Sequence, residues 1–92
     1  MENRMAKYEI VAKHIREWDP YGLLRTGAPD DEFDSEIAAV TPRILPDSSR
    51  HEIAAVLSAV FSSAFEPEPF TVPMCYDVAD RISRDLKNIG DK

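Results

Sequence analysis

The 92-residue sequence has little cysteine, histidine and glycine, and each shortage argues against a class of site. Its one cysteine, Cys75, cannot form an internal disulfide bond. His14, His51 and Cys75 lie far apart in the chain, and no two of them have the spacing of metal ligands. Only three glycines are present, and they form no phosphate-binding loop. The sequence therefore predicts no catalytic residues, no cofactor and no metal.

Long apolar runs and an excess of positive charge are also missing. The apolar runs are too short to span a membrane, and no basic-then-apolar leader is present, which predicts a cytoplasmic protein. The net charge of -6 repels phosphate backbones, so we expect no nucleic-acid partner. Hydrophobic residues make up 43% and charged residues 30%, an ordinary globular composition. One domain over residues 1–92 is the expected organisation.

Four stretches carry apolar residues at helical spacing, so we predict an all-α bundle of four principal helices with one or two short helical turns. The first helix covers residues 3–18, with His14 at its solvated edge and Ile10 either exposed or in a second contact. Asp19 and Pro20 end this helix and open a short turn that Asp19 caps and Gly27 terminates. The apolar stripe consists of Met5, Tyr8, Val11, Ala12, Ile15 and Trp18.

The second helix is expected to start at a cap formed by Asp30 or Asp31. Pro42 conflicts with a continuous helix, so we expect an end or a kink within residues 41–45, with Pro46 closing the segment. The apolar stripe of this helix is Phe33, Ile37, Val40 and Ile44.

The third helix has the clearest start, because Ser49 and Glu52 have capping-box spacing. His51, in its first turn, is expected to be solvated or to act as a cap. The core stripe is Ile53, Val56, Leu57, Val60, Phe61 and Ala64. The opposite face is small, and it is either partly buried against another helix or exposed; it consists of Ala54, Ala55, Ser58, Ala59, Ser62 and Ser63.

Three prolines within residues 66–73 predict an extended crossing that Phe70 and Val72 attach to the core. A final helix is expected from near Pro73 to Gly90. Its apolar stripe is Cys75, Val78, Ala79, Ile82, Leu86 and Ile89, which makes the cysteine a core residue.

An acidic run is the one unusual segment, because residues 20–47 hold two-thirds of the net charge. Acids in a first helical turn satisfy free N–H groups and favour the helix dipole, which explains Asp30, Asp31 and Glu32 better than Asp34 and Glu36. The alternatives are a surface for a cationic protein partner, or a metal site in which Glu32 and Glu36 share an ion. Trp18 is either a core anchor or an interface anchor.

Several of these residues together resemble the YugE-like family of short bacterial helical proteins, a domain of unknown function. The pattern is W-D-P at Trp18-Asp19-Pro20, followed by Leu23-Leu24, Gly27-Ala28-Pro29 and Asp31-Glu32-Phe33-Asp34-x-Glu36-Ile37. The resemblance covers about residues 5–65 and implies a small helical fold and a bacterial origin. It implies no activity, cofactor or catalytic residue.

The favoured function is a non-enzymatic protein-interaction module that binds a basic partner. By analogy, some small acidic bacterial proteins act as immunity proteins or antitoxins, and an acidic helix can imitate the phosphate row that a nuclease toxin recognises. A carboxylate-based metal protein or enzyme that uses the acidic run is the alternative. A helical homodimer that packs its small-residue face or Ile10 is a third. The expected partner-binding residues are Asp31, Glu32, Asp34, Glu36 and Trp18.

Overall fold

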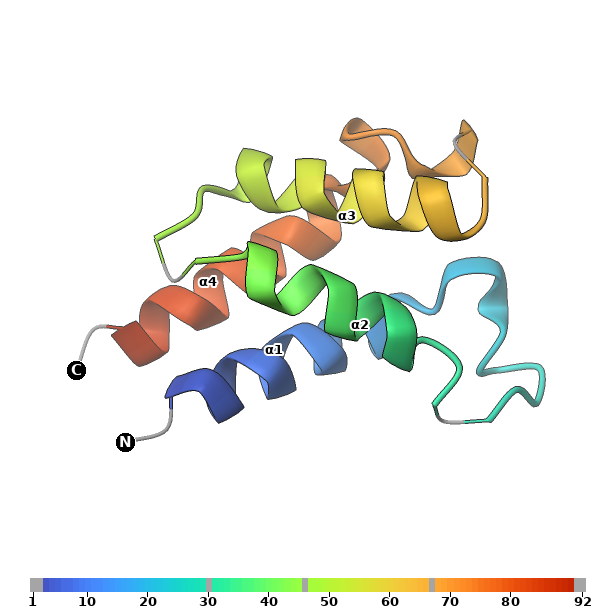
Figure 1. Cartoon of the computed structure of the whole chain (residues 1–92), viewed down its shortest axis with the longest axis horizontal. Helices are drawn as coiled ribbons and strands as arrows, with labels where there is room; N and C mark the ends of the chain where they lie inside the picture. The colour runs from blue at the N-terminus through green and yellow to red at the C-terminus, as the bar shows by residue number, and fades with distance from the viewer. Residues whose placement is uncertain (1–2, 30, 46, 67, 91–92) are drawn as a thin grey trace.

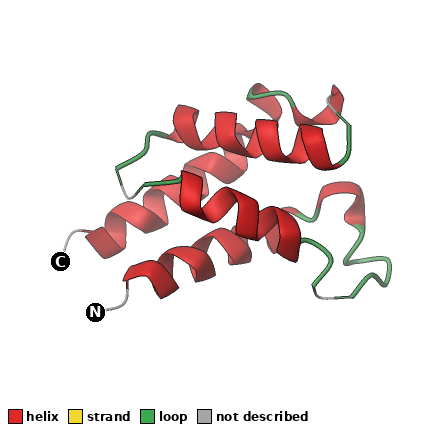
Figure 2. Ribbon diagram, viewed as in Figure 1, coloured by secondary structure: helices red, strands yellow, loops and turns green. Residues whose placement is uncertain are grey.

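The computed structural model describes residues 3–29, 31–45, 47–66 and 68–90. These residues form four α-helices, α1 (Asn3–Trp18), α2 (Asp34–Val40), α3 (Arg50–Ala64) and α4 (Tyr76–Gly90). Short 3-10 turns lie between them: η1 (Pro20–Gly22), η2 (Thr41–Arg43), η3 (Glu68–Phe70) and η4 (Pro73–Cys75). No strand occurs in the described part of the chain (Figure 2). The predicted all-α class is confirmed.

The four helices surround one hydrophobic core. α1 packs against α2 and α4, and α3 packs against the same two helices from the other side. Figure 1 shows α3 above, α1 below, α2 in front and α4 behind. Within the described ranges, no helix combines the length and the apolar character that a membrane crossing requires.

Helix α1 has the predicted bounds, and its stripe is buried in part. Val11, Ala12 and Ile15 are at most 3% exposed, whereas Tyr8 is 36% exposed and was wrongly assigned to the core. Ile10 packs against the core at its edge, which is the second contact that the sequence left open. The side chain of Met5 lies outside the described residues.

Helix α2 is shorter than predicted because it begins only at Asp34. Ile37 and Val40 are buried, and Phe33, the residue just before the helix, is fully buried as well. The helix ends at Val40, where η2 continues the chain with Pro42 among its first residues. The predicted end or kink within residues 41–45 is therefore confirmed. The predicted role of Pro46 lies outside the described residues.

Helix α3 begins with the predicted capping box. The Glu52 N–H donates to the Ser49 hydroxyl, and the Ser49 N–H donates to the Glu52 carboxylate. Ile53, Leu57 and Phe61 are fully buried, whereas Ala64 is exposed although it was assigned to the stripe.

The small face of α3 is buried in part. Ala54 is fully buried, and the Ser58 hydroxyl donates to the Phe70 carbonyl at 2.5 Å. The proline-rich connection thus packs on this face, whereas Ala59 on the same face stays exposed.

The sequence predicted an extended connection after α3. The observed connection is extended only in part, because it contains the short helical turns η3 and η4. A proline in the first positions of a helical turn loses no hydrogen bond, which makes these turns compatible with Pro73. Phe70 is 3% exposed and Val72 packs against the core, so their predicted attachment is confirmed. Helix α4 follows and ends at Gly90. Its buried residues include Val78, Ala79, Ile82 and Leu86.

Candidate functional site

Asp31 and Glu32 lie in the turn that precedes α2, and both side chains are exposed. The backbone of this turn is hydrogen-bonded: the Glu32 N–H donates to the Pro29 carbonyl at 3.0 Å, and the Asp34 N–H donates to the Asp31 carbonyl at 3.1 Å. Neither side chain makes a hydrogen bond or an ion pair with any other residue that the structure describes. Two consecutive exposed carboxylates therefore have no cation partner among the described residues.

The start of α2 does not use these carboxylates. The N-cap residue is Phe33, and no side-chain hydrogen bond caps the helix. The prediction that Asp31 caps this helix is therefore wrong, because two consecutive turns delay the helix start to Asp34. Asp30, the other predicted cap, lies outside the described residues.

Asp34 is held by a neighbouring helix. Its carboxylate accepts from the Arg16 guanidinium of α1 at 3.0 Å, and both side chains are nearly half exposed. An exposed pair of this kind contributes at most about 1 kcal/mol to folding. It compensates one of the four predicted acidic charges within the molecule.

Glu36 points to a different place from Asp31 and Glu32. Its side chain lines a hollow between α2 and α3, where Arg43 and Ser63 are also found. The Glu36 Oε1 atom is shielded from solvent and has no hydrogen-bond partner among the described residues. The acidic run is thus divided into an exposed pair, a compensated charge and a partly buried charge.

Trp18 ends α1 against the aromatic part of the core. Its ring centroid lies 5.2 Å from that of Phe61 and 5.8 Å from that of Phe70, the latter in an edge-to-face arrangement. Such contacts are typical of a core anchor. Trp18 is partly buried and does not lie in the turn with Asp31 and Glu32.

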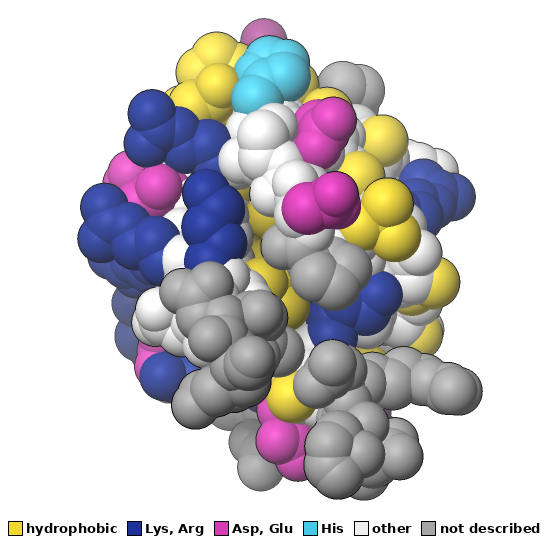
Figure 3. All heavy atoms as spheres, turned by 90° about the vertical axis from the view of Figure 1, so that its left-hand side faces the viewer, with side chains coloured by type: hydrophobic (Ala, Val, Ile, Leu, Met, Phe, Trp, Pro, Cys, Tyr) yellow, Lys and Arg dark blue, Asp and Glu magenta, His cyan; other side chains and the backbone are white. Residues whose placement is uncertain are grey.

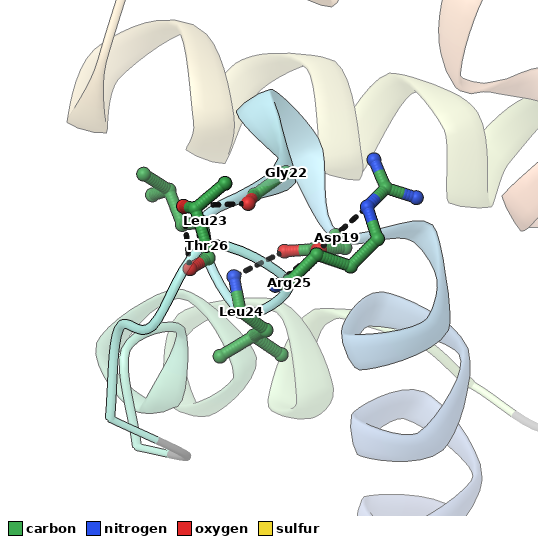
Figure 4. Close-up of polar contacts among 6 residues, drawn as sticks. All are labelled: Asp19, Gly22, Leu23, Leu24, Arg25 and Thr26. Carbon is green, nitrogen blue, oxygen red and sulfur yellow. Dashed lines mark hydrogen bonds and ion pairs between the residues drawn. The ribbon is translucent and has the colours of Figure 1, made fainter.

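The loop after Trp18 contains a group of hydrogen bonds around Asp19. The sequence predicted Asp19 as a cap but did not predict these bonds. Asp19 is 5% exposed and has a positive φ of 49°, which is rare for a residue other than glycine. It precedes η1 as predicted, but its side chain does not cap that turn. Its carboxylate instead accepts the backbone N–H groups of Leu24 at 2.8 Å and Arg25 at 3.2 Å (Figure 4).

Further contacts close the same loop. The Thr26 hydroxyl donates to the Gly22 carbonyl at 2.9 Å, and the Arg25 Nε lies 3.7 Å from the Asp19 carboxylate (Figure 4). Gly27 has a φ of 112°, in agreement with its predicted role as the left-handed terminator. The residues of the W-D-P and Gly27 pattern therefore have structural roles in this chain.

His14 is buried, and its predicted place at a solvated edge is wrong. It is 8% exposed, and its Nε2 lies 2.7 Å from the Asp85 carboxylate of α4. Its Nδ1 has no hydrogen-bond partner among the described residues and lies 3.7 Å from a Glu17 carboxylate oxygen. No local signal reveals this contact, because Asp85 is 71 residues away in the chain.

The remaining candidate side chains, His51 and Cys75, make contacts that belong to the fold. His51 is exposed as predicted, and its Nδ1 lies 2.9 Å from the Tyr76 hydroxyl. Cys75 is fully buried, and desolvation raises the pKa of its thiol from 9.0 to about 11. A neutral thiol is a poor nucleophile. In the ranges that the structure describes, no three His, Cys, Asp or Glu side chains gather where they could hold a metal ion.

One comparison with known proteins gives a match. A family model described as a domain of unknown function, DUF1871, matches residues 10–90. No curated protein and no solved structure matches the chain.

Proposed function

Because the chain belongs to the DUF1871 family, whose description states no function, we propose one from its own residues: a non-enzymatic protein-interaction module. Its acidic surface, Asp31 and Glu32 with Asp34 beside them, binds a basic protein partner. The observation that carries this proposal is that the two exposed carboxylates neither cap α2 nor pair with a described cation. Within the described part of the chain, no side-chain contact of either residue stabilises the fold.

The distribution of charge over the molecule supports an oriented approach of a basic partner. The turn with Asp31 and Glu32 lies at the end of the molecule remote from both termini (Figure 1). Helix α4 exposes Arg81, Arg84 and Lys87. Figure 3 shows Lys and Arg side chains gathered along one side of the end that carries the termini. Charges separated in this way steer and orient a partner of complementary charge during encounter.

The same proposal includes the narrower family, the origin and the cellular location of the chain. The pattern from Trp18 to Ile37 supports a YugE-like protein of bacterial origin that acts in the cytoplasm. An immunity protein or antitoxin that neutralises a basic enzyme is the specific form of the module that its acidic surface suits best.

Affinity capture from cells of the source organism tests the proposal. The native chain is compared with a double variant, Asp31→Asn with Glu32→Gln, which keeps the size of both side chains. The matched control is Glu9→Gln with Asp77→Asn, which removes the same charge from two exposed positions on α1 and α4.

We expect a basic protein to be captured by the native chain and the control, and to be lost or strongly reduced with the double variant. Added salt should reduce its capture by the native chain, because exposed charges are screened beyond about 8 Å at physiological ionic strength. Equal recovery of the same proteins by all three baits at low salt would show that the acidic surface has no role in binding.

A further inference from the structure

The hollow between α2 and α3 is a second candidate binding site, and its lining does not include Asp31 or Glu32. Its volume is about 360 Å³. Glu36 and Ala39 of α2 line one wall with Arg43 of η2, and Ala59 and Ser63 of α3 contribute to the other. Ala59 and Ser63 are exposed. Small side chains at these positions let a helix from outside approach the backbone closely, since interaxial distance depends on the side chains at the contact.

Two charged residues, Glu36 and Arg43, line the hollow, and neither forms an ion pair with a described residue. Glu36 Oε1 is shielded from solvent without a hydrogen-bond donor among the described residues. Glu36 as a whole is only partly buried, so its negative charge attracts a cation that approaches from outside. Arg43 is exposed, and its guanidinium pairs with no carboxylate in the described part of the chain.

The two charged residues lie on either side of Ala39 along the chain, three residues before it and four residues after it. Glu36 and Arg43 are seven residues apart, which is about two helical turns or roughly 10 Å along the axis. Both line the same hollow, so they lie on one side of α2 and η2. Glu36, Ala39 and Arg43 thus form a row with a negative charge at one end, a small side chain in the middle and a positive charge at the other end.

We propose that this surface binds a second copy of the chain in a two-fold symmetric dimer. A two-fold axis through the hollow near Ala39 makes two α2 helices antiparallel. Glu36 of each copy then meets Arg43 of the other, so that the same patch serves both sides of the interface. The contact places a guanidinium beside each Glu36 and a carboxylate beside each Arg43, and neither residue has an ion-pair partner among the described residues.

The charge pattern favours a second copy over an unrelated cationic partner. A lysine- or arginine-rich segment would be attracted by Glu36 but repelled by Arg43. The same row of a second, antiparallel copy has an opposite charge at both ends. Paired charges of this kind fix orientation and register, and the small side chains between them provide the close contact. The surface does not include Asp31 or Glu32, so it is independent of the acidic surface that binds the proposed basic partner.

Charge reversal tests the dimer. The Glu36→Lys variant has two positive ends on its row, and the Arg43→Glu variant has two negative ends. Sedimentation velocity over a range of concentrations measures self-association. We expect the native chain to dimerise, and each variant alone to associate at least about tenfold more weakly, because like charges across an interface repel strongly.

Mixing the two variants provides the decisive arm. In a mixed dimer, every charge meets its opposite, so we expect a heterodimer close to the native affinity. The double variant Glu36→Lys with Arg43→Glu should also dimerise with itself. Association in the mixture would show that both single variants had folded. Their far-ultraviolet circular dichroism should also match that of the native chain.

Lys13→Glu on α1 is the matched control, because Lys13 is exposed and lies outside the hollow. It should leave the dissociation constant within about twofold of the native value. The variant with Asp31→Asn and Glu32→Gln should dimerise normally, so loss of partner capture and loss of the dimer are distinguishable. A native chain that stays monomeric at all concentrations would overturn the proposal, even if it binds a lysine-rich peptide. A mixture that associates no better than its separate components would also overturn it.

Discussion

The carboxylate of Asp19 accepts the backbone N–H of Leu24 at 2.8 Å and thereby fixes the loop that follows α1. Asp19 is buried and has a positive φ of 49°. Aspartate is one of the few residues other than glycine that enter this conformation readily, since its short polar side chain bonds to nearby backbone groups. Its place between Trp18 and Pro20 thus has both a conformational and a hydrogen-bonding reason.

Replacement of Asp19 should separate these two reasons. Asp19→Ala removes the acceptor and places an alanine at positive φ, and we expect it to lower the free energy of unfolding by about 2–3 kcal/mol. Asp19→Gly removes the acceptor but relieves the backbone, so it should cost about 1 kcal/mol less. Asp19→Asn keeps an acceptor oxygen and should cost least. Urea denaturation measures all three, and an Ala variant as stable as the native chain would contradict this role.

The hydrogen bond between His14 and Asp85 should couple α1 to α4. A double-mutant cycle with His14→Ala and Asp85→Ala should give a coupling free energy of about 1 kcal/mol. Glu17 supplies the control, because its carboxylate lies 3.7 Å from His14 Nδ1 and is largely exposed. The cycle of His14→Ala with Glu17→Ala should give below about 0.5 kcal/mol. Equal coupling in the two cycles would argue against the specific bond.

Ile37 and Leu57 should be the strongest test of the core. Both are fully buried, so truncation to alanine should lower the free energy of unfolding by about 2–5 kcal/mol at each site. Lys13→Ala, at an exposed position, should change it by no more than about 0.5 kcal/mol. Losses below about 1 kcal/mol at both apolar sites, seen in chemical denaturation, would mean that these faces do not form the core.

The buried thiol of Cys75 should make stability fall in alkaline solution. Its pKa is about 11 in the folded chain against 9.0 for an ordinary thiol, because burial disfavours the thiolate. The unfolded chain therefore loses this proton first, and the contribution is complete below pH 9 and declines as the pH rises towards 11. Relative to Cys75→Ala, the native chain should lose about 2 kcal/mol over this range. Denaturation curves at several pH values under reducing conditions measure the difference, and a constant difference would contradict the shift.

Local signals predicted much of the fold. Ser49 and Glu52 located the start of α3, because a capping box involves only residues three apart. Pro42 located the end of α2, because it cannot continue the helix without losing a hydrogen bond. Phe33 lies on the expected apolar stripe and is buried, yet it precedes the helix, since two turns of backbone come before Asp34.

Contacts between distant segments could not be predicted in the same way. His14 lies just outside the apolar stripe of α1, and only the packing of α4 brings Asp85 to it. The acidic run looked continuous in the sequence. Arg16 of α1 and the hollow beside α3 divide it, because they reach Asp34 and Glu36 but neither Asp31 nor Glu32.

The most direct test of the proposed function is the association rate constant with the captured basic partner, measured against ionic strength. For the native chain, this rate should be high at low salt and fall steeply as salt is added, because complementary charge acts mainly on encounter. The variant with Asp31→Asn and Glu32→Gln should associate more slowly and with a shallower dependence on salt, whereas the control variant with Glu9→Gln and Asp77→Asn should stay closer to the native curve. Native and double-variant curves that coincide at every ionic strength would contradict the assignment of Asp31 and Glu32 as the docking surface.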